Sequence, residues 1–297
     1  MNNDHPDYLR RRLLTALALT PLLPAWPAAA QTPDTARILS LEWLPTELLL
    51  ALGVTPMGVA DIRNYNLWVQ APALPASVRD LGTRTEPNME LVQQLNPSLL
   101  LYSNGFGTPP EMLGRIAPAQ GFSFNDGSGH PLPLAMQSLR QLAATLGLEN
   151  RAQAHLARVE QHLQQAHEQL RAWRAVPLLL FTLMNAGSAL VLGRGSLFAD
   201  VMARLELTNA WQGETNFWGS AVVSIEQLAA IDDAQGIFFS HGNEGLLRQV
   251  QQTPLWRALP FVRKRPVQVQ PAVWFYGATL SAMRFCDLLG HALGERP

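Results

Sequence analysis

The sequence predicts a mixed α/β protein of two lobes that are joined by one long helix. Short apolar segments typical of buried strands alternate with helical patterns from residue 37, and the same alternation resumes after residue 175. Between these two series, residues 151–175 form one uninterrupted amphipathic pattern. The chain has 297 residues, of which 47% are hydrophobic, so it can bury one large core or two smaller ones. We expect an N-terminal lobe at 31–147, a linking helix at 148–175 and a C-terminal lobe at 176–297.

The first thirty residues have the composition of an export signal. Arginines at 10–12 precede an apolar run, and three alanines at 28–30 offer a cleavage site. Pro21 and Pro24 interrupt this run, which is shorter than the roughly 20 apolar residues that a membrane-spanning helix needs. The order RRRLL resembles a twin-arginine signal, which would export a folded protein, and an ordinary secretory signal is the alternative.

The mature chain is expected in the periplasm of a Gram-negative bacterium. Its single cysteine, Cys286, lies in a helical pattern near the C-terminus, so we expect neither an internal disulfide nor a lipid anchor beside the cleavage site. Residues 1–30 hold three arginines and two aspartates, which leaves 19 basic and 21 acidic residues and a net charge of −2. This balance does not favour nucleic acid or an anionic membrane as a partner. We expect a monomer that does not span a membrane.

The N-terminal lobe is predicted to contain short buried strands with helices between them. The strands are expected at 37–43, 57–61 and 99–103, where apolar residues are bounded by turn residues. A helix is expected at 45–53, which opens with proline and threonine and ends in glycine. A second helix is expected at 88–95, where apolar residues are spaced three and four apart.

The linking segment, residues 151–175, predicts one amphipathic helix about 37 Å long at 1.5 Å per residue. Apolar residues recur at alternating intervals of four and three, at Ala152, Leu156, Val159, Leu163, Ala166, Leu170 and Trp173. A coiled coil would show the same pattern, but the position between two α/β series favours a helix packed across both lobes. Such a rigid connection predicts a cleft that is mostly preformed. Three histidines on this helix, His155, His162 and His167, lack the spacing of a metal pair and are predicted to be solvated.

The C-terminal lobe repeats the alternation of strands and helices. The predicted strands are 177–184, 189–193, 236–241 and 267–270. The predicted helices are 196–207, 224–231, 246–259 and 279–293.

The sequence lacks the usual motifs of catalysis. It has no nucleophile elbow, phosphate-binding glycine loop, zinc-protease helix or CxxC pair. The glycine-rich segment 193–198 is explained by a tight turn in which Ser196 caps the next helix. Asp232 and Asp233 fit a solvated loop better than a catalytic pair. We therefore expect a protein that is not an enzyme.

Two short segments concentrate aromatic residues, TNFWGS at 215–220 and VWFYG at 273–277. Trp218 and Trp274 lie beside glycines at the ends of segments, and Trp68 lies in a polar, proline-containing stretch typical of a loop. Each tryptophan alone can also be a partly buried ring between elements. Three such rings in both halves favour a shared aromatic cleft, because a large ring buries apolar ligand surface while its polar edge forms hydrogen bonds.

A candidate cation for this cleft is Arg84, in the connection before the helix at 88–95. Its guanidinium offers a planar set of donors to ligand oxygens. An exposed ion pair with Glu86 is the alternative.

Several segments resemble the periplasmic ferric hydroxamate siderophore-binding proteins of enterobacterial ABC importers. They include LEWLPTELLLALG, RTEPNMELV, NAWQGETNFWGS and PAVWFYGATLSAM, and the resemblance runs from the arginine-rich leader to the last helix. It implies the helical-backbone (class III) periplasmic binding protein fold with a shallow aromatic cleft. It also implies that an Fe(III)-hydroxamate siderophore is delivered to an inner-membrane permease powered by a cytoplasmic ATPase.

The resemblance assigns roles to individual residues. Arg84 corresponds to the arginine that hydrogen-bonds hydroxamate oxygens. The aromatic lining corresponds to Trp68, Trp218, Trp274 and Tyr276, and the polar cleft positions correspond to Asn216 and Ser220. Phe106 replaces a tyrosine that bonds the ligand in this family, and a lost neutral hydrogen bond costs about 0.5–1.5 kcal/mol, or up to roughly tenfold in affinity. Glu111 and Glu226, one on each lobe, are implied to pair with permease arginines.

The chemistry of the chelate agrees with this assignment. Three hydroxamates saturate Fe(III), so the protein needs no metal ligand and no cofactor of its own. Two alternatives remain open. One is a binding protein for a different iron chelate, a corrinoid or haem. Phe106, in place of the ligand-bonding tyrosine, leaves this alternative open. The other is a twin-arginine-exported enzyme that holds a redox cofactor, although nucleotide and metal motifs are missing.

Overall fold

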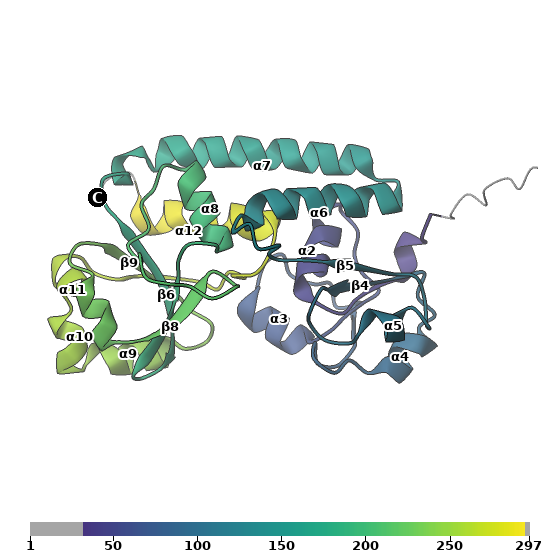
Figure 1. Ribbon diagram of the computed structural model, residues 1–297, viewed down its shortest axis with the longest axis horizontal. Helices are drawn as coiled ribbons and strands as arrows, with labels where there is room; N and C mark the ends of the chain where they lie inside the picture. Colours follow the sequence, from purple (N-terminus) through teal and green to yellow (C-terminus); the bar gives the residue numbers. More distant parts are fainter. Residues whose placement is uncertain (1–31, 295–297) are drawn as a thin grey trace, which may run out of the picture. The chain divides into compact units, whose positions relative to one another are not determined.

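The computed structural model describes residues 32–294, which form two five-stranded sheets and the helices around them (Figure 1). The predicted export signal, residues 1–30, lies outside the described residues. The two sheets and one long helix confirm the predicted class of two mixed α/β lobes joined by a helix. None of the described helices is long and apolar enough to cross a membrane.

The first sheet is parallel throughout and has the strand order β3-β2-β1-β4-β5. Its strands are β1 (Ile38–Ser40), β2 (Gly58–Val59), β3 (Arg79–Asp80), β4 (Leu99–Ser103) and β5 (Ala119–Phe122). The three predicted strands are confirmed as β1, β2 and β4, although β1 and β2 are shorter than predicted. The two edge strands were not predicted, because β3 consists of two exposed residues and β5, with the sequence AQGF, is neither apolar nor alternating.

The helices of this lobe are η1 (Thr35–Arg37), α2 (Trp43–Ala51), α3 (Ile62–Trp68), α4 (Met89–Gln94), α5 (Pro110–Leu113) and α6 (Pro131–Leu146). Helix α2 begins two residues before its predicted start, because the Glu42 carboxylate caps it by accepting a hydrogen bond from Leu44 N at 2.7 Å. Pro45 then lies in the first helical turn, where a missing N–H costs nothing. The segment around Trp68 is a helix rather than the predicted loop. Tyr65 is the buried residue of α3, so this helix has no apolar stripe for a sequence pattern to reveal.

The second sheet is mixed and has the order β10-β9-β6-β7-β8, with β7 antiparallel to both of its neighbours. Its strands are β6 (Leu178–Asn185), β7 (Ser188–Leu192), β8 (Ser220–Ser224), β9 (Gln235–Phe239) and β10 (Gln268–Gln270). Four of them were predicted. The fifth, β8, directly follows the aromatic segment TNFWG, so the sheet itself carries that segment.

The helices of the C-terminal lobe are η2 (Arg171–Trp173), α8 (Leu197–Arg204), η3 (Glu226–Ala230), α9 (Glu244–Gln251), α10 (Pro254–Ala258), α11 (Pro260–Lys264) and α12 (Thr279–Leu293). The predicted helix 246–259 is wrong as one element. It is divided into α9 and α10, because the Thr253 hydroxyl accepts from Trp256 N at 3.3 Å and Pro254 opens the new helix. The predicted helix 224–231 is the 3-10 helix η3.

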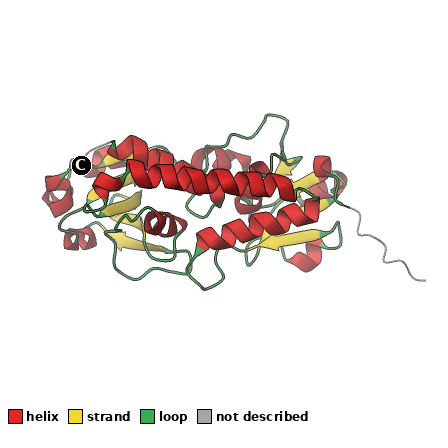
Figure 2. Ribbon diagram, turned by 90° about the horizontal axis from the view of Figure 1, so that it is seen from above, coloured by secondary structure: helices red, strands yellow, loops and turns green. Residues whose placement is uncertain are grey.

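The long helix is α7 (Glu149–Gln169), which packs on α6 and α12 (Figure 1) and is the long helix across the middle of the view from above (Figure 2). It ends four residues short of Trp173, and η2 carries that ring to the core instead. One continuous apolar core joins α7 to both sheets, with members such as Leu48, Leu163, Phe239 and Phe285. The predicted lobe boundaries at 147/148 and 175/176 remain predictions. The strands of the two sheets occupy 38–122 and 178–270, on either side of α7 in the sequence.

Of the three histidines of α7, His155 is buried rather than solvated as predicted, whereas His162 and His167 remain partly exposed. His155 is 2% exposed, and its Nε2 lies 2.8 Å from the Thr279 hydroxyl of α12. Burial lowers the pKa of His155 to about 4. His162 lies 2.9 Å from the Asp287 carboxylate of α12. The prediction failed because α12 packs along α7, a contact between distant segments that widens the buried face beyond the apolar stripe.

Candidate functional site

A cavity of about 640 Å³ is lined by residues of both lobes. Its aromatic and cationic lining includes Arg84, Phe106, Phe124, Trp218, Trp274 and Tyr276. The N-terminal lobe contributes loops that follow β3, β4 and β5, and the C-terminal lobe contributes segments before β8 and α12. The predicted convergence of an arginine with tryptophans from distant parts of the chain is therefore present in the structure.

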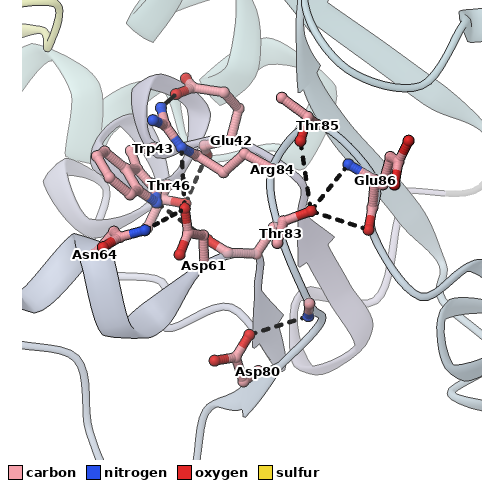
Figure 3. A network of polar contacts seen from close by, with 12 residues as sticks. Glu42, Trp43, Thr46, Asp61, Asn64, Asp80, Thr83, Arg84, Thr85 and Glu86 are labelled. Atoms are coloured by element: carbon pink, nitrogen blue, oxygen red, sulfur yellow. Dashed lines mark hydrogen bonds and ion pairs between the residues drawn. The ribbon is translucent and has the colours of Figure 1, made fainter.

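Arg84 is fixed by a carboxylate and by aromatic faces. Its Nη1 donates to Glu42 Oε1 at 2.6 Å, and its Nε lies 3.8 Å from Asp61 Oδ2 (Figure 3). The guanidinium carbon lies 3.4 Å from the ring centroid of Trp43. The alternative pairing with Glu86 is not what the structure shows. Within residues 32–294 no hydrogen bond engages Nη2 of this cavity-lining guanidinium, so donor capacity remains for a ligand.

Glu42 is a site residue that the sequence reasoning missed. It is 7% exposed, and its Oε2 accepts hydrogen bonds from Leu44 N at 2.7 Å and from the Ser103 hydroxyl at 2.8 Å. The same carboxylate therefore caps α2, contacts the end of β4 and orients Arg84. The available signal was an acidic residue at the end of the predicted strand 37–43, three residues before the predicted helix start at 45, where negative charge is favoured.

Aromatic side chains form a continuous wall from one lobe to the other. Trp274 makes edge contacts with Trp43 and Tyr276, with ring centroids 4.7 and 5.2 Å apart. Tyr276 continues the wall to Trp218 and Phe124, at 5.4 and 5.5 Å. Trp274 is 7% exposed, and its buried Nε1 has no hydrogen-bond partner among the described residues.

Trp68 is placed beside this wall rather than in the cavity. It ends α3 and stacks on His241, with ring centroids 4.2 Å apart. It reaches the cavity indirectly, through an edge contact with Trp274 at 6.3 Å. His241 is 6% exposed, and burial lowers its pKa to about 4. The Trp68–His241 stack therefore joins neutral rings of the two lobes.

Asn216 and Ser220 do not line the cavity, but they form hydrogen bonds with the residues of its aromatic wall. Asn216 Oδ1 accepts hydrogen bonds from Trp218 N at 2.8 Å and from the Ser220 N–H and hydroxyl, both at 3.2 Å. The Ser220 hydroxyl also lies 3.2 Å from the Tyr276 hydroxyl, and burial raises the pKa of Tyr276. Gly219 closes this turn with φ = +70°, and a Cβ there would lie 2.0 Å from Ser196 N. The segment TNFWGS is thus a rigid turn that presents Trp218.

Phe106 lines the cavity, with its ring centroid 5.4 Å from the guanidinium carbon of Arg84. Nearby Tyr102 does not supply a hydroxyl in its place. The ring of Tyr102 lies against Gly121 of β5, where an added Cβ would be 2.6 Å from it. Because phenylalanine stands at 106 in place of the tyrosine that the resemblance implies, this part of the wall is apolar.

The two glutamates predicted for docking are exposed and do not line the cavity. Glu111 is in the first turn of α5, and Glu226 is the first residue of η3. Hydrogen bonds from the backbone N–H of Glu226 and from the Ser224 side chain lower the pKa of the Glu226 carboxyl. Among residues 32–294, no group of three or more histidine, cysteine or acidic side chains is arranged to hold a metal ion.

Comparisons with known proteins agree with this fold. The chain is 51% identical over 294 residues to the iron(3+)-hydroxamate-binding protein FhuD of Escherichia coli (strain K12), which covers 98% of each chain. It is 25% identical over 248 residues to the Fe(3+) dicitrate-binding periplasmic protein FecB of the same organism, covering 78% of this chain and 75% of the relative. The crystal structure of the siderophore-binding protein FhuD from Vibrio cholerae, bound to Fe3+-Desferal, superposes with a TM-score of 0.80 at 27% identity. That match covers 89% of this chain and 100% of the other.

The family comparison gives the same result over most of the described residues. The model of the periplasmic binding protein family matches residues 38–273, from the first strand to the second aromatic segment. This match spans both sheets and α7, and it includes Arg84 and the turn that presents Trp218. The chain belongs to the periplasmic binding protein family.

Proposed function

We propose that this protein binds Fe(III)-hydroxamate siderophores in the cavity and delivers them to an inner-membrane ABC permease. The observation that carries the proposal is the placement of one guanidinium, Arg84, within a wall of aromatic rings from both lobes. The 51% identity to a ferric hydroxamate-binding protein over nearly the whole chain supports it. Binding and delivery need no catalytic step.

The surface of the chelate suits this lining. Its apolar skeleton packs against aromatic faces, and its hydroxamate oxygens accept hydrogen bonds from Arg84. Because the hydroxamates saturate the iron, the protein contributes no metal ligand. Glu42 orients Arg84, while Asn216 and Ser220 support Trp218 and Tyr276 from behind. Trp68 supports Trp274, and Phe106 supplies an apolar contact.

The ligand assignment is tested by quenching of tryptophan fluorescence. Ferrichrome, a neutral Fe(III)-trihydroxamate, is expected to quench the emission in a saturable way, because Trp218 and Trp274 line the cavity. Iron-free ferrichrome, a ferric tris-catecholate, haem and a corrinoid serve as comparisons. No response to ferrichrome alongside a saturable response to another chelate would overturn the hydroxamate assignment and support that ligand instead.

Arg84→Ala is expected to weaken ferrichrome binding by about tenfold to a hundredfold, because a charge-assisted hydrogen bond contributes about 1.5–3 kcal/mol. The double variant Arg84→Gln with Glu42→Gln removes both charges together, so it avoids a buried unpaired carboxylate. Arg79→Ala, an exposed position on β3, is the control. The change in Kd is measured by fluorescence titration. Parent-like affinity in both Arg84 variants would remove Arg84 from the site.

We further infer that Glu111 and Glu226 pair with arginines of the permease, since both carboxylates are exposed on different lobes. Their alanine variants are expected to reduce uptake of radiolabelled ferrichrome in cells while the Kd stays unchanged. Glu90→Ala and Glu214→Ala, which change other exposed glutamates, are controls. Normal uptake in the Glu111→Ala/Glu226→Ala double variant would contradict the inference.

Location and assembly follow from the same proposal. The leader directs the chain to the periplasm, where it acts as a monomer. Release by osmotic shock and a monomeric mass in multi-angle light scattering are the expected results. Retention in the cytoplasmic fraction would contradict this location.

A further inference from the structure

A hydrogen bond crosses from one lobe to the other at the cavity wall. Asn125, in the loop after β5, donates from Nδ2 to the backbone carbonyl of Phe217 at 2.7 Å. Its Oδ1 accepts a hydrogen bond from Gly127 N at 2.9 Å. Because one end must accept and the other must donate, these two partners fix the orientation of the amide. Asn125 is 9% exposed and lines the cavity.

The acceptor of this bond belongs to the peptide group that leads directly to Trp218. Trp218 N is itself held by Asn216 Oδ1 at 2.8 Å, and Gly219 N donates to Asn216 O at 2.9 Å. The N–H groups of Trp218 and Gly219 are thus bonded within the C-terminal lobe, and the Phe217 carbonyl is bonded to Asn125 of the N-terminal lobe. The Phe217 side chain remains 56% exposed, and the Trp218 ring lies 5.8 Å from Phe124, which directly precedes Asn125.

Other contacts keep the two lobes in place behind this wall. The Glu47 carboxylate of α2 accepts from Ser281 N at 2.8 Å and from the Ser281 hydroxyl at 2.7 Å, at the start of α12. Asp200 of α8 accepts from Leu132 N at 3.1 Å, at the start of α6. Because the lobes are held there, we expect loss of the Asn125 bond to shift the turn at 216–219 relative to the N-terminal lobe, without moving the whole lobe.

We propose that Asn125 is a positioning residue that holds the Phe217–Trp218 turn in its ligand-binding place and thereby sets how long the ligand stays bound. This inference rests on the proposed function for its ligand and on the bond between Asn125 and Phe217 for its geometry. A wall that is already in place when the ligand arrives lowers the ordering cost of binding. The effect of losing the bond therefore falls on the dissociation rate, as is usual for changes within one interface.

The sharpest variant is Asn125→Asp. It keeps the size of the side chain and an oxygen that accepts from Gly127 N, so the local turn of its own loop is preserved. It replaces the Nδ2 donor by an oxygen that faces the Phe217 carbonyl, so the bond between the lobes is lost and two acceptors repel. Asn125→Ala removes both bonds. Asn185→Ala is the control, because Asn185 is exposed and makes the same kind of local bond, to Gly187 N at 2.9 Å.

The kinetic experiment is stopped-flow tryptophan fluorescence with ferrichrome. For Asn125→Asp and Asn125→Ala we expect the dissociation rate to rise about three- to tenfold, with the association rate within about twofold of the parent. Asn185→Ala should match the parent. Unchanged dissociation rates in both Asn125 variants would overturn the proposal.

A second readout needs no ligand. In protein labelled with 5-fluorotryptophan, the 19F NMR signal of Trp218, identified by its loss in Trp218→Phe, is expected to shift or broaden in Asn125→Asp and to stay unchanged in Asn185→Ala. An identical Trp218 signal in parent and Asn125→Asp would overturn the positioning role. If the parent does not bind ferrichrome, the proposed function fails while this spectrum still decides the role of Asn125.

Discussion

The carboxylate of Glu42 and the ring of His155 show how single buried polar groups position larger parts of this protein. Glu42 links the start of α2, the end of β4 and Arg84. His155 links α7 to the start of α12 through the Thr279 hydroxyl at 2.8 Å. Both groups are buried with partners, which is the condition under which a polar side chain is tolerated in a core.

The low pKa of His155 predicts a pH dependence of stability. Burial lowers its pKa to about 4, against an ordinary value of 6.5. As pH falls below 6.5 the unfolded chain takes up a proton that the folded chain resists, so the free energy of unfolding decreases towards pH 4. We expect a shallower decrease in His155→Gln, measured by urea denaturation from pH 7 to pH 4.

The control for this prediction is His291→Gln, which changes an exposed histidine of α12. Its pH dependence should follow that of the parent. The free energy of unfolding of His155→Gln will still decrease with falling pH, because burial also lowers the pKa of His241 to about 4. The same pH dependence of the free energy of unfolding in the parent and in His155→Gln would contradict the prediction.

At the scale of elements, α7 matters because one of its faces belongs to the core shared by both lobes. Leu163 is 3% exposed within this core. Leu163→Ala is expected to lower the free energy of unfolding by about 2–5 kcal/mol, the usual cost of a large-to-small change in a core. Gln165→Ala, an exposed position on the same helix, should change it by less than about 0.5 kcal/mol.

This prediction is measured by urea denaturation followed by circular dichroism and by tryptophan fluorescence. Because α7 packs on both lobes through one core, the two signals should change together in the parent. A loss of stability for Leu163→Ala as small as that for Gln165→Ala would contradict the core role of Leu163. Separate transitions in the two signals of the parent would contradict coupling of the lobes through α7.

At the scale of the whole described unit, buried contacts join the two lobes. Glu47 joins α2 to α12, and α12 in turn packs on α7. Desolvation disfavours the charged form of Glu47 and raises its pKa. Burial of this carboxylate therefore costs free energy, which its hydrogen bonds to Ser281 offset. A long helix together with these bonds favours a cleft that changes little on binding.

Small-angle X-ray scattering can test this rigidity. We expect the radius of gyration to stay the same when ferrichrome is added at saturation, since binding to a preorganised site moves the backbone little. A decrease on the order of 1 Å would indicate closure of one lobe on the other and contradict the prediction. The Asn125→Asp variant should give the same radius as the parent, because it frees a turn and not a lobe.

Much of the architecture was predictable because its signals are local. The strand at 99–103 and the helix at 279–293 have the predicted bounds, since apolar runs and periodicity depend on neighbouring residues alone. The convergence of Arg84, Trp218 and Trp274 was also predicted, from the context of each residue and from the resemblance to a family. Helix α3 and strand β3 were not predicted, because a segment with few buried residues shows no periodic pattern of apolar residues.

Local sequence patterns were enough to predict the two series of strands and helices, the amphipathic α7, and the aromatic and cationic residues available for a ligand. The packing of the two lobes was needed to show which residues line the cavity and which only support the lining residues. In the structure, Asn216 and Ser220 support the rings without lining the cavity, and Trp68 stacks on His241 beside it. Glu42 and Asn125 are part of the site. This difference arises because periodicity reports burial along one segment. A hydrogen bond between residues far apart in the chain depends on how both lobes pack.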